Sequence, residues 1–186
     1  LGLAILGVLA SAAGVFLRGD LATIPYVTFR GEHVDMLTGG VYRYNGLKIA
    51  SEGVGWDAVT LFLVVPALAL MLPGLWNGSL RAKLVVTGIL AYFLYQYVEY
   101  AAFLAYGPLF LLYVATFALS LTGIILLVAT INLAEAGTRF GPRFPRRAMV
   151  GLSLFMALLL TGMWLPLVAR TAGGDIGKAL DGATTL

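Results

Sequence analysis

LVVTGILAYFLYQYVEYAAFLAYGPLFLLYVATFALSLTGIILLVATINL, residues 84–133, decides the fold of this chain. The stretch carries one charged residue, Glu99, and Gly107-Pro108 divides it into two apolar blocks, Leu84–Tyr106 and Leu109–Leu133. A helix needs about 20 apolar residues to cross the hydrocarbon core of a bilayer, and each block is that long. The sequence therefore predicts two antiparallel membrane-spanning helices in an integral membrane protein.

Composition supports a membrane protein. The chain is 60% hydrophobic and 11% charged, whereas soluble domains carry about 25% charged residues. The sequence has no cysteine and a single histidine, His33. Thiolate metal sites and a haem with two axial histidines are therefore excluded within this chain, and we expect no metal and no cofactor.

Three further apolar stretches, at 1–17, 58–76 and 149–169, bring the predicted number of spans to five. We expect an all-α integral membrane fold, a five-helix transmembrane bundle with a small extracytoplasmic β-hairpin or meander between spans one and two. The predicted parts are span one at 1–17, the β-rich segment at 18–56, spans two to five within 57–170 and a tail at 171–186. A short similarity between Asp57–Leu61 and Asp181–Leu186 raises the expectation that the tail leads to a further span.

Basic residues in two short loops set the predicted orientation. The loops after spans two and four contain Arg81, Lys83, Arg139, Arg143, Arg146 and Arg147. The positive-inside rule places both loops in the cytoplasm. In the plasma (cytoplasmic) membrane, the N-terminus is then cytoplasmic, and residues 18–56 and the tail are extracytoplasmic. The second loop is also a candidate contact for anionic lipid or a partner.

The segment 18–56 contains a predicted β-hairpin. Strands at 26–30 and 33–37 flank Gly31-Glu32, which suits a type II′ turn. This register pairs Phe29 with Val34 and Val27 with Met36, and it places all four on one buried face. The other face takes Thr28, Arg30, His33 and Asp35. Residues 41–44 are a candidate third strand, and Asn45-Gly46 either turns a second hairpin or caps a short helix through Ser51.

Glu99 is the main candidate functional residue, because a charge at its depth in a membrane is costly. No lysine or arginine lies within a predicted span, so we expect either a protonated Glu99 that hydrogen-bonds into the protein or a Glu99 that meets a cation from elsewhere. Its candidate partners recur at helical spacing on spans three and four: Tyr92, Tyr95, Tyr113, Thr116 and Ser120. This set is a small-ligand or proton site, a structural hydrogen bond between the two spans, or a contact to a partner subunit.

Small residues at helical spacing predict close helix packing in two spans. They are Gly7, Ser11 and Gly14 in the first span and Ser153, Ala157 and Thr161 in the fifth. This pattern carries no functional information beyond packing.

The sequence carries no Gly-rich phosphate loop, no Gly-x-Ser-x-Gly motif and no clustered carboxylates. We therefore expect a non-enzymatic integral membrane component, an accessory or scaffold subunit of a larger membrane assembly. Its expected partners are the lipid bilayer and other membrane subunits or further copies of the chain, and not nucleic acid. The alternative is a small-ligand or proton-coupled transporter or binding protein centred on Glu99. A third hypothesis is an enzyme acting on lipid, with Asp57 and Glu99 as its acids.

The stretch Tyr-Gly-Pro-Leu-Phe-Leu-Leu-Tyr-Val-Ala, Tyr106–Ala115, resembles part of an uncharacterised family of polytopic bacterial membrane proteins. Residues Gly39–Thr60 resemble the same family. The resemblance implies a bacterial polytopic membrane protein, and it implies no function and no site residue.

Overall fold

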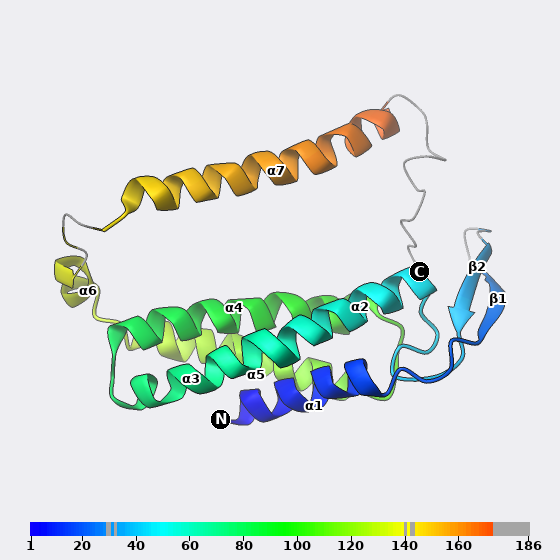
Figure 1. The fold of residues 1–186 in the computed structure, drawn as a ribbon, viewed down its shortest axis with the longest axis horizontal. Helices are drawn as coiled ribbons and strands as arrows, with labels where there is room; N and C mark the ends of the chain where they lie inside the picture. The colour runs from blue at the N-terminus through cyan, green and yellow to red at the C-terminus, as the bar shows by residue number, and fades with distance from the viewer. Residues whose placement is uncertain (29–30, 32, 140, 142–143, 173–186) are drawn as a thin grey trace. The chain divides into compact units, whose positions relative to one another are not determined.

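A computed structural model describes residues 1–186 except 29–30, 32, 140, 142–143 and 173–186 (Figure 1). The chain divides into two compact units, one over Leu1–Asn132 and one that begins at Leu133. The first unit contains α1 (Gly2–Phe16), β1 (Thr23–Val27), β2 (His33–Leu37), α2 (Leu47–Val59), α3 (Val65–Trp76), α4 (Leu80–Phe103) and α5 (Phe110–Ala129). The second contains α6 (Leu133–Arg139) and α7 (Arg146–Ala172).

Among the described residues, four helices are long and apolar enough to cross a membrane, whereas the sequence predicted five. They are Leu47–Trp76, Leu80–Phe103, Phe110–Ala129 and Arg146–Pro166. The stretch 1–17, predicted as span one, contains α1, which has 15 residues. At 1.5 Å per residue α1 rises about 22 Å, which is less than the hydrocarbon core of about 30 Å. The prediction of five spans was therefore wrong by one.

The helix predicted from residue 58 begins earlier, at Leu47, and continues to Trp76. It consists of α2, a π-helical turn at Thr60–Val64 and α3. Pro66, in the first turn of α3, lacks the N–H that an α-helix needs, and a wider π turn accommodates such a break. Of the two alternatives for Asn45-Gly46, the helix is correct, although Gly46 rather than Asn45 is the N-cap residue.

β1 and β2 form a two-stranded antiparallel hairpin in a register that differs from the predicted one. β2 has its predicted bounds, but β1 begins at Thr23. Consequently Tyr26 pairs with Val34 and Ile24 pairs with Met36. The strand also includes Pro25, which an edge strand tolerates because no partner needs its missing N–H. The prediction failed because it assumed a two-residue turn, whereas five residues separate the strands.

The predicted faces of the first strand are also wrong, since Val27 is exposed and Thr28 is buried. Phe29 and Arg30 lie outside the described residues. The third strand predicted at 41–44 does not form. These residues make turns, and an isolated bridge joins Met36 to Gly46.

The core of the first unit lies along one face of α4, where that helix meets α1, α3 and α5 (Figure 1). Phe93 and Tyr97 are fully buried there, with their rings stacked at 5.8 Å between centroids. Gly7 permits α1 to approach closely, because a Cβ atom at this position would lie 2.9 Å from the Phe93 ring. The predicted small-residue stripe of the first span therefore faces the core.

The second unit is dominated by α7, whose described apolar side chains are exposed within it. Its window Arg146–Pro166 has no buried residue. A helix that is apolar on all sides is typical of a segment surrounded by lipid or by other apolar helices.

Candidate functional site

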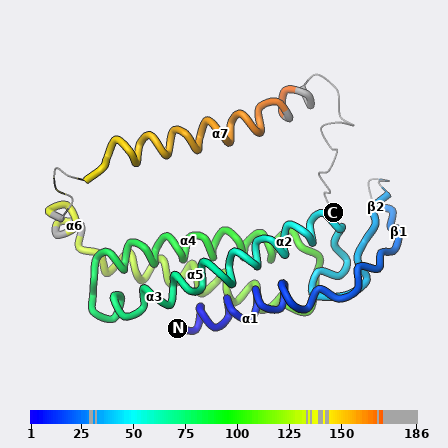
Figure 2. Tube along the Cα trace, viewed as in Figure 1, coloured from blue at the N-terminus to red at the C-terminus, as the bar shows by residue number. Residues whose placement is uncertain are grey.

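The loop between β2 and α2, residues 38–46, connects the hairpin to the helices at one end of the first unit (Figure 2). We refer to it as the β2–α2 loop. Its backbone N–H at Val41 donates to the Leu17 carbonyl at the end of α1, at 3.1 Å. The Asn45 Oδ1 atom accepts a hydrogen bond from the Ala105 N–H just after α4, at 2.9 Å. The loop therefore ties together three segments that are distant in sequence.

A glycine is required where this loop passes the end of α1. Gly40 has a φ of 75°, and a Cβ atom there would collide with the backbone of Arg18. The close passage allows the loop to reach the helices and to insert a side chain between them.

Tyr42 is that side chain, and its hydroxyl donates a hydrogen bond to Oδ2 of Asp57 on α2. The hydroxyl of Tyr100, on α4, lies 3.2 Å from the Tyr42 hydroxyl, 3.3 Å from Asp57 Oδ1 and 2.9 Å from the Gly53 carbonyl oxygen. Asp57 is 1% exposed and Tyr42 is 2% exposed. We refer to Tyr42, Asp57 and Tyr100 as the polar cluster.

Two glycines make room for the polar cluster. A Cβ atom on Gly14 of α1 would overlap the Asp57 carboxyl group and lie 3.1 Å from the Tyr42 hydroxyl. A Cβ atom on Gly53 would lie 2.6 Å from the Tyr42 ring. The cluster therefore depends on α1, α2, α4 and the β2–α2 loop together.

The described hydrogen-bond partners of the Asp57 carboxyl are tyrosine hydroxyls, and no basic side chain is among them. Burial raises the pKa of the Tyr42 phenol, and the neighbouring Tyr100 and Asp57 raise it further. Tyr42 therefore keeps its proton and remains a hydrogen-bond donor.

A group of tyrosine rings extends from the polar cluster toward α5. The ring centroids of Tyr100 and Tyr113 are 5.0 Å apart, and those of Tyr97 and Tyr113 are 6.0 Å apart. In the part of the chain that the structure describes, the hydroxyls of Tyr97 and Tyr113 and the side-chain amide of Gln96 are buried without a hydrogen-bond partner. Such an unsatisfied group costs about 1–3 kcal/mol, so these atoms are places for water or a polar ligand.

Of the polar side chains predicted around Glu99, Tyr95 bonds it and the others bond or pack elsewhere. Glu99 is half-buried, and the hydroxyl of Tyr95, one turn before it, hydrogen-bonds the Glu99 carboxyl group, although Tyr95 is 57% exposed. The Tyr92 hydroxyl hydrogen-bonds Thr60 at 2.8 Å. The Thr116 and Ser120 hydroxyls donate to carbonyls of their own helix, at 2.7 and 2.6 Å. Of the predicted set, Tyr113 lies closest to the polar cluster through its contact with Tyr100.

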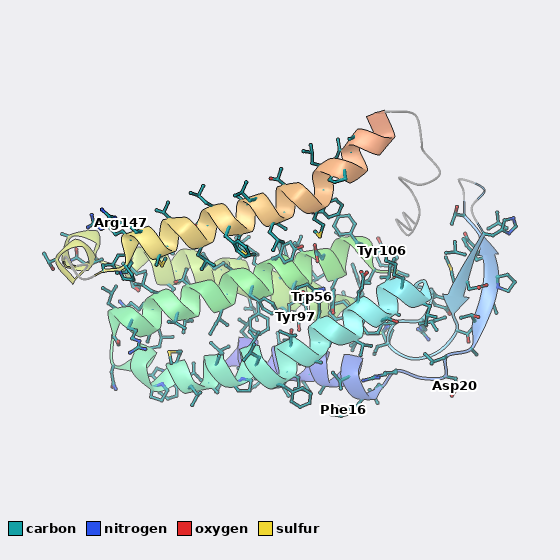
Figure 3. All side chains as sticks on the ribbon, turned by 45° about the horizontal axis from the view of Figure 1, so that its top comes forward. Phe16, Asp20, Trp56, Tyr97, Tyr106 and Arg147 are labelled. Atoms are coloured by element: carbon teal, nitrogen blue, oxygen red, sulfur yellow. The ribbon has the colours of Figure 1, made fainter. Side chains whose placement is uncertain are left out.

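The basic residues proposed as a lipid or partner contact lie in the second unit. Arg146 and Arg147 begin α7 with exposed side chains. Figure 3 labels Arg147 at this end of the helix. The position of Arg143 and the side chain of Arg139 lie outside what the structure describes.

Sequence reasoning missed the polar cluster, although Asp57 was noted as an acid. One signal was available, because Ala50, Gly53 and Asp57 recur at helical spacing and are the buried residues of α2. A stripe of small residues that ends in a carboxyl group predicts that this group is buried.

A hollow of about 310 Å³ lies elsewhere in the first unit, between α1, α3, α4 and α5. Its lining is almost entirely apolar and includes Leu72, Val86 and Leu90, but neither Glu99 nor Asp57. The carboxyl groups therefore do not line this hollow.

Comparisons with protein families, with curated proteins and with solved structures found no match to this chain.

Proposed function

We propose that this chain is an integral membrane protein that acts as a non-enzymatic component of a larger membrane assembly, in which it presents the β1–β2 hairpin to a partner. The observation that carries this proposal is the contrast in burial between the base of the hairpin and its strand β1. Its base is held by buried residues, Leu37, Tyr42 and Asn45, whereas its strand β1 is exposed along its whole length.

The exposed side of the hairpin is suited to apolar contact. Ile24 and Tyr26 lie on one face of β1 and are each 49% exposed. Large exposed apolar residues that a rigid base holds in place are typical of protein–protein contact sites. Contact through side chains is favoured over added strand pairing, since Pro25 removes one N–H from the edge of β1.

The four long apolar helices support insertion into a membrane. We propose the orientation that the basic loops favour, with residues 18–56 outside and the loop after α3 inside, in the cytoplasmic membrane. The hairpin then meets its partner on the extracytoplasmic side.

The test is purification from native membranes in mild detergent, comparing the wild type with the double variant Ile24→Ser/Tyr26→Ser. Leu47→Ser is the matched control, because Leu47 is 50% exposed in the same unit but lies outside the hairpin. The proposal expects one stoichiometric partner with the wild type and with Leu47→Ser, and its loss with the double variant. A wild-type protein that purifies without a stoichiometric partner, or equal recovery of the partner with all three proteins, contradicts it.

The alternative of a small-ligand or proton-coupled transporter centred on Glu99 has weaker support. The hollow in the first unit is apolar and does not include Glu99. Of the predicted hydroxyl partners, Tyr95 hydrogen-bonds Glu99 but is 57% exposed, whereas the Tyr92 and Thr116 hydroxyls bond elsewhere. Transport that Glu99→Gln abolishes, at unchanged thermal stability, would establish this alternative.

A further inference from the structure

The polar cluster contains more oxygen–oxygen contacts than hydroxyl protons to bridge them. Four oxygen–oxygen contacts occur: Tyr42 to Asp57 Oδ2, Tyr42 to Tyr100, Tyr100 to Asp57 Oδ1, and Tyr100 to the Gly53 carbonyl. Each hydroxyl has one proton, and a carbonyl or an ionised carboxylate has none. With an ionised Asp57, two protons serve four contacts.

The ionised form leaves an unfavourable contact in either arrangement of the Tyr100 proton. If Tyr100 donates to Gly53, its oxygen faces Asp57 Oδ1 at 3.3 Å with no proton between them. If it donates to Asp57, its oxygen faces the Gly53 carbonyl at 2.9 Å in the same way. Buried acceptors that face one another without a donor are costly.

A third proton, on Asp57 Oδ1, supplies a donor to every contact of the carboxyl group and of the Gly53 carbonyl, and leaves only the 3.2 Å contact between the two tyrosine hydroxyls without one. Asp57 then donates to Tyr100, Tyr100 donates to the Gly53 carbonyl, and Tyr42 donates to Asp57 Oδ2. We propose that the Asp57 carboxyl is a reversible proton-binding site that holds the β2–α2 loop on the helices when it is protonated. The inference goes beyond the proposed function and is independent of whether a partner binds the hairpin.

The groups around Asp57 favour a proton over a metal cation as the ligand. The described titratable groups that interact with it are phenols: Tyr42 from the loop, Tyr92, Tyr97 and Tyr100 from α4, and Tyr113 from α5. The helix α1 contributes Gly14, which carries no charge. The cluster oxygens lie at hydrogen-bonding distances from one another, which leaves a proton as the ligand that fits between them.

Loss of the proton is expected to open the loop. A carboxylate that has no cation is unstable in a buried site, and its release into water requires Tyr42 and the loop to leave the helices. The proton passes to water in this step, and rebinding restores the closed form. Opening therefore rises with pH, by up to about tenfold for each pH unit above the point where the proton is lost.

The first experiment is infrared spectroscopy of the full chain in detergent at neutral pH. The wild type is compared with Asp57→Asn, which removes the carboxyl group at similar size. Glu99→Gln is the control, because it removes another carboxyl group from an apolar helix. The wild-type-minus-Asp57→Asn difference is expected to show the carbonyl band of a protonated carboxylic acid, which Glu99→Gln retains. An ionised carboxylate band in that difference overturns the proposal.

The second experiment needs no folded Asp57 variant. Trypsin cleavage after the exposed Arg43 of the loop is measured against cleavage after the exposed Arg81, so that the pH dependence of the protease cancels. The wild-type ratio is expected to rise with pH, and in Asp57→Asn, where that variant folds, it is expected to stay constant. A wild-type ratio that does not change with pH overturns the proposal.

Discussion

Gly14→Ala probes the polar cluster with a single methyl group. The added Cβ atom would overlap the Asp57 carboxyl group, so either α1 or the carboxyl has to move. Overpacking of this kind costs about 1–3 kcal/mol. Displacing Asp57 from the Tyr42 hydroxyl leaves a buried acceptor unsatisfied and costs about 1–3 kcal/mol more. Alanine gains about 1 kcal/mol over glycine in a helix interior, which leaves a net destabilisation of about 1–5 kcal/mol.

Gly88→Ala is the matched control, because a Cβ atom at Gly88 of α4 meets nothing within 4 Å. This variant is expected to gain stability from helix propensity alone, by up to about 1 kcal/mol. The two glycine-to-alanine changes should therefore have opposite signs. In a soluble chain of this size 1 kcal/mol shifts Tm by about 2–4 °C, which sets the scale for detecting the difference.

The assay is thermal unfolding of both variants in the same detergent, followed by circular dichroism. A Gly14→Ala protein that is as stable as Gly88→Ala would refute the close packing of α1 against Asp57.

The remaining predictions concern single side chains and orientation. Tyr42→Phe should lower the free energy of unfolding by about 1–3 kcal/mol, whereas Tyr97→Phe should lower it little. Of these two hydroxyls, only that of Tyr42 makes a described hydrogen bond. Equal losses of stability in chemical denaturation would contradict this prediction. Glu99→Gln should leave Tm unchanged, since Glu99 is only half-buried, and a clear fall in Tm would show that its charge matters to the fold. Cysteines placed at Glu52 and Asn77, at opposite ends of the helix Leu47–Trp76, should label from opposite sides of the membrane, and labelling from one side only would refute the orientation.

The long apolar helices were predictable because their signal is local. Twenty apolar residues in a row predict a span without reference to any other part of the chain, and α4 and α5 lie within a few residues of their predicted bounds. The early start of α2 was not predictable in this way, since Lys48, Glu52 and several glycines give its first turns a mixed composition.

Features that depend on distant segments were predicted poorly. The hairpin register followed from an assumed turn length, and the wrong length moved the first strand by three residues. Glu99 was favoured because it stands alone in an apolar stretch, whereas Asp57 directly precedes the span predicted at 58–76. Burial of Asp57 is set by Gly14, Tyr42 and Tyr100, and no local pattern connects these three residues.

The central claim is that the polar cluster holds the β2–α2 loop, and with it the hairpin, on the helices. Hydrogen exchange in the double variant Tyr42→Phe/Tyr100→Phe tests this claim most directly, because amides in and beside the loop report whether it stays bound. We predict that the amides of Val41 and Ala105, which bond to Leu17 and Asn45, lose protection together while those of α5 keep theirs. Unchanged protection at Val41 and Ala105 would contradict the account.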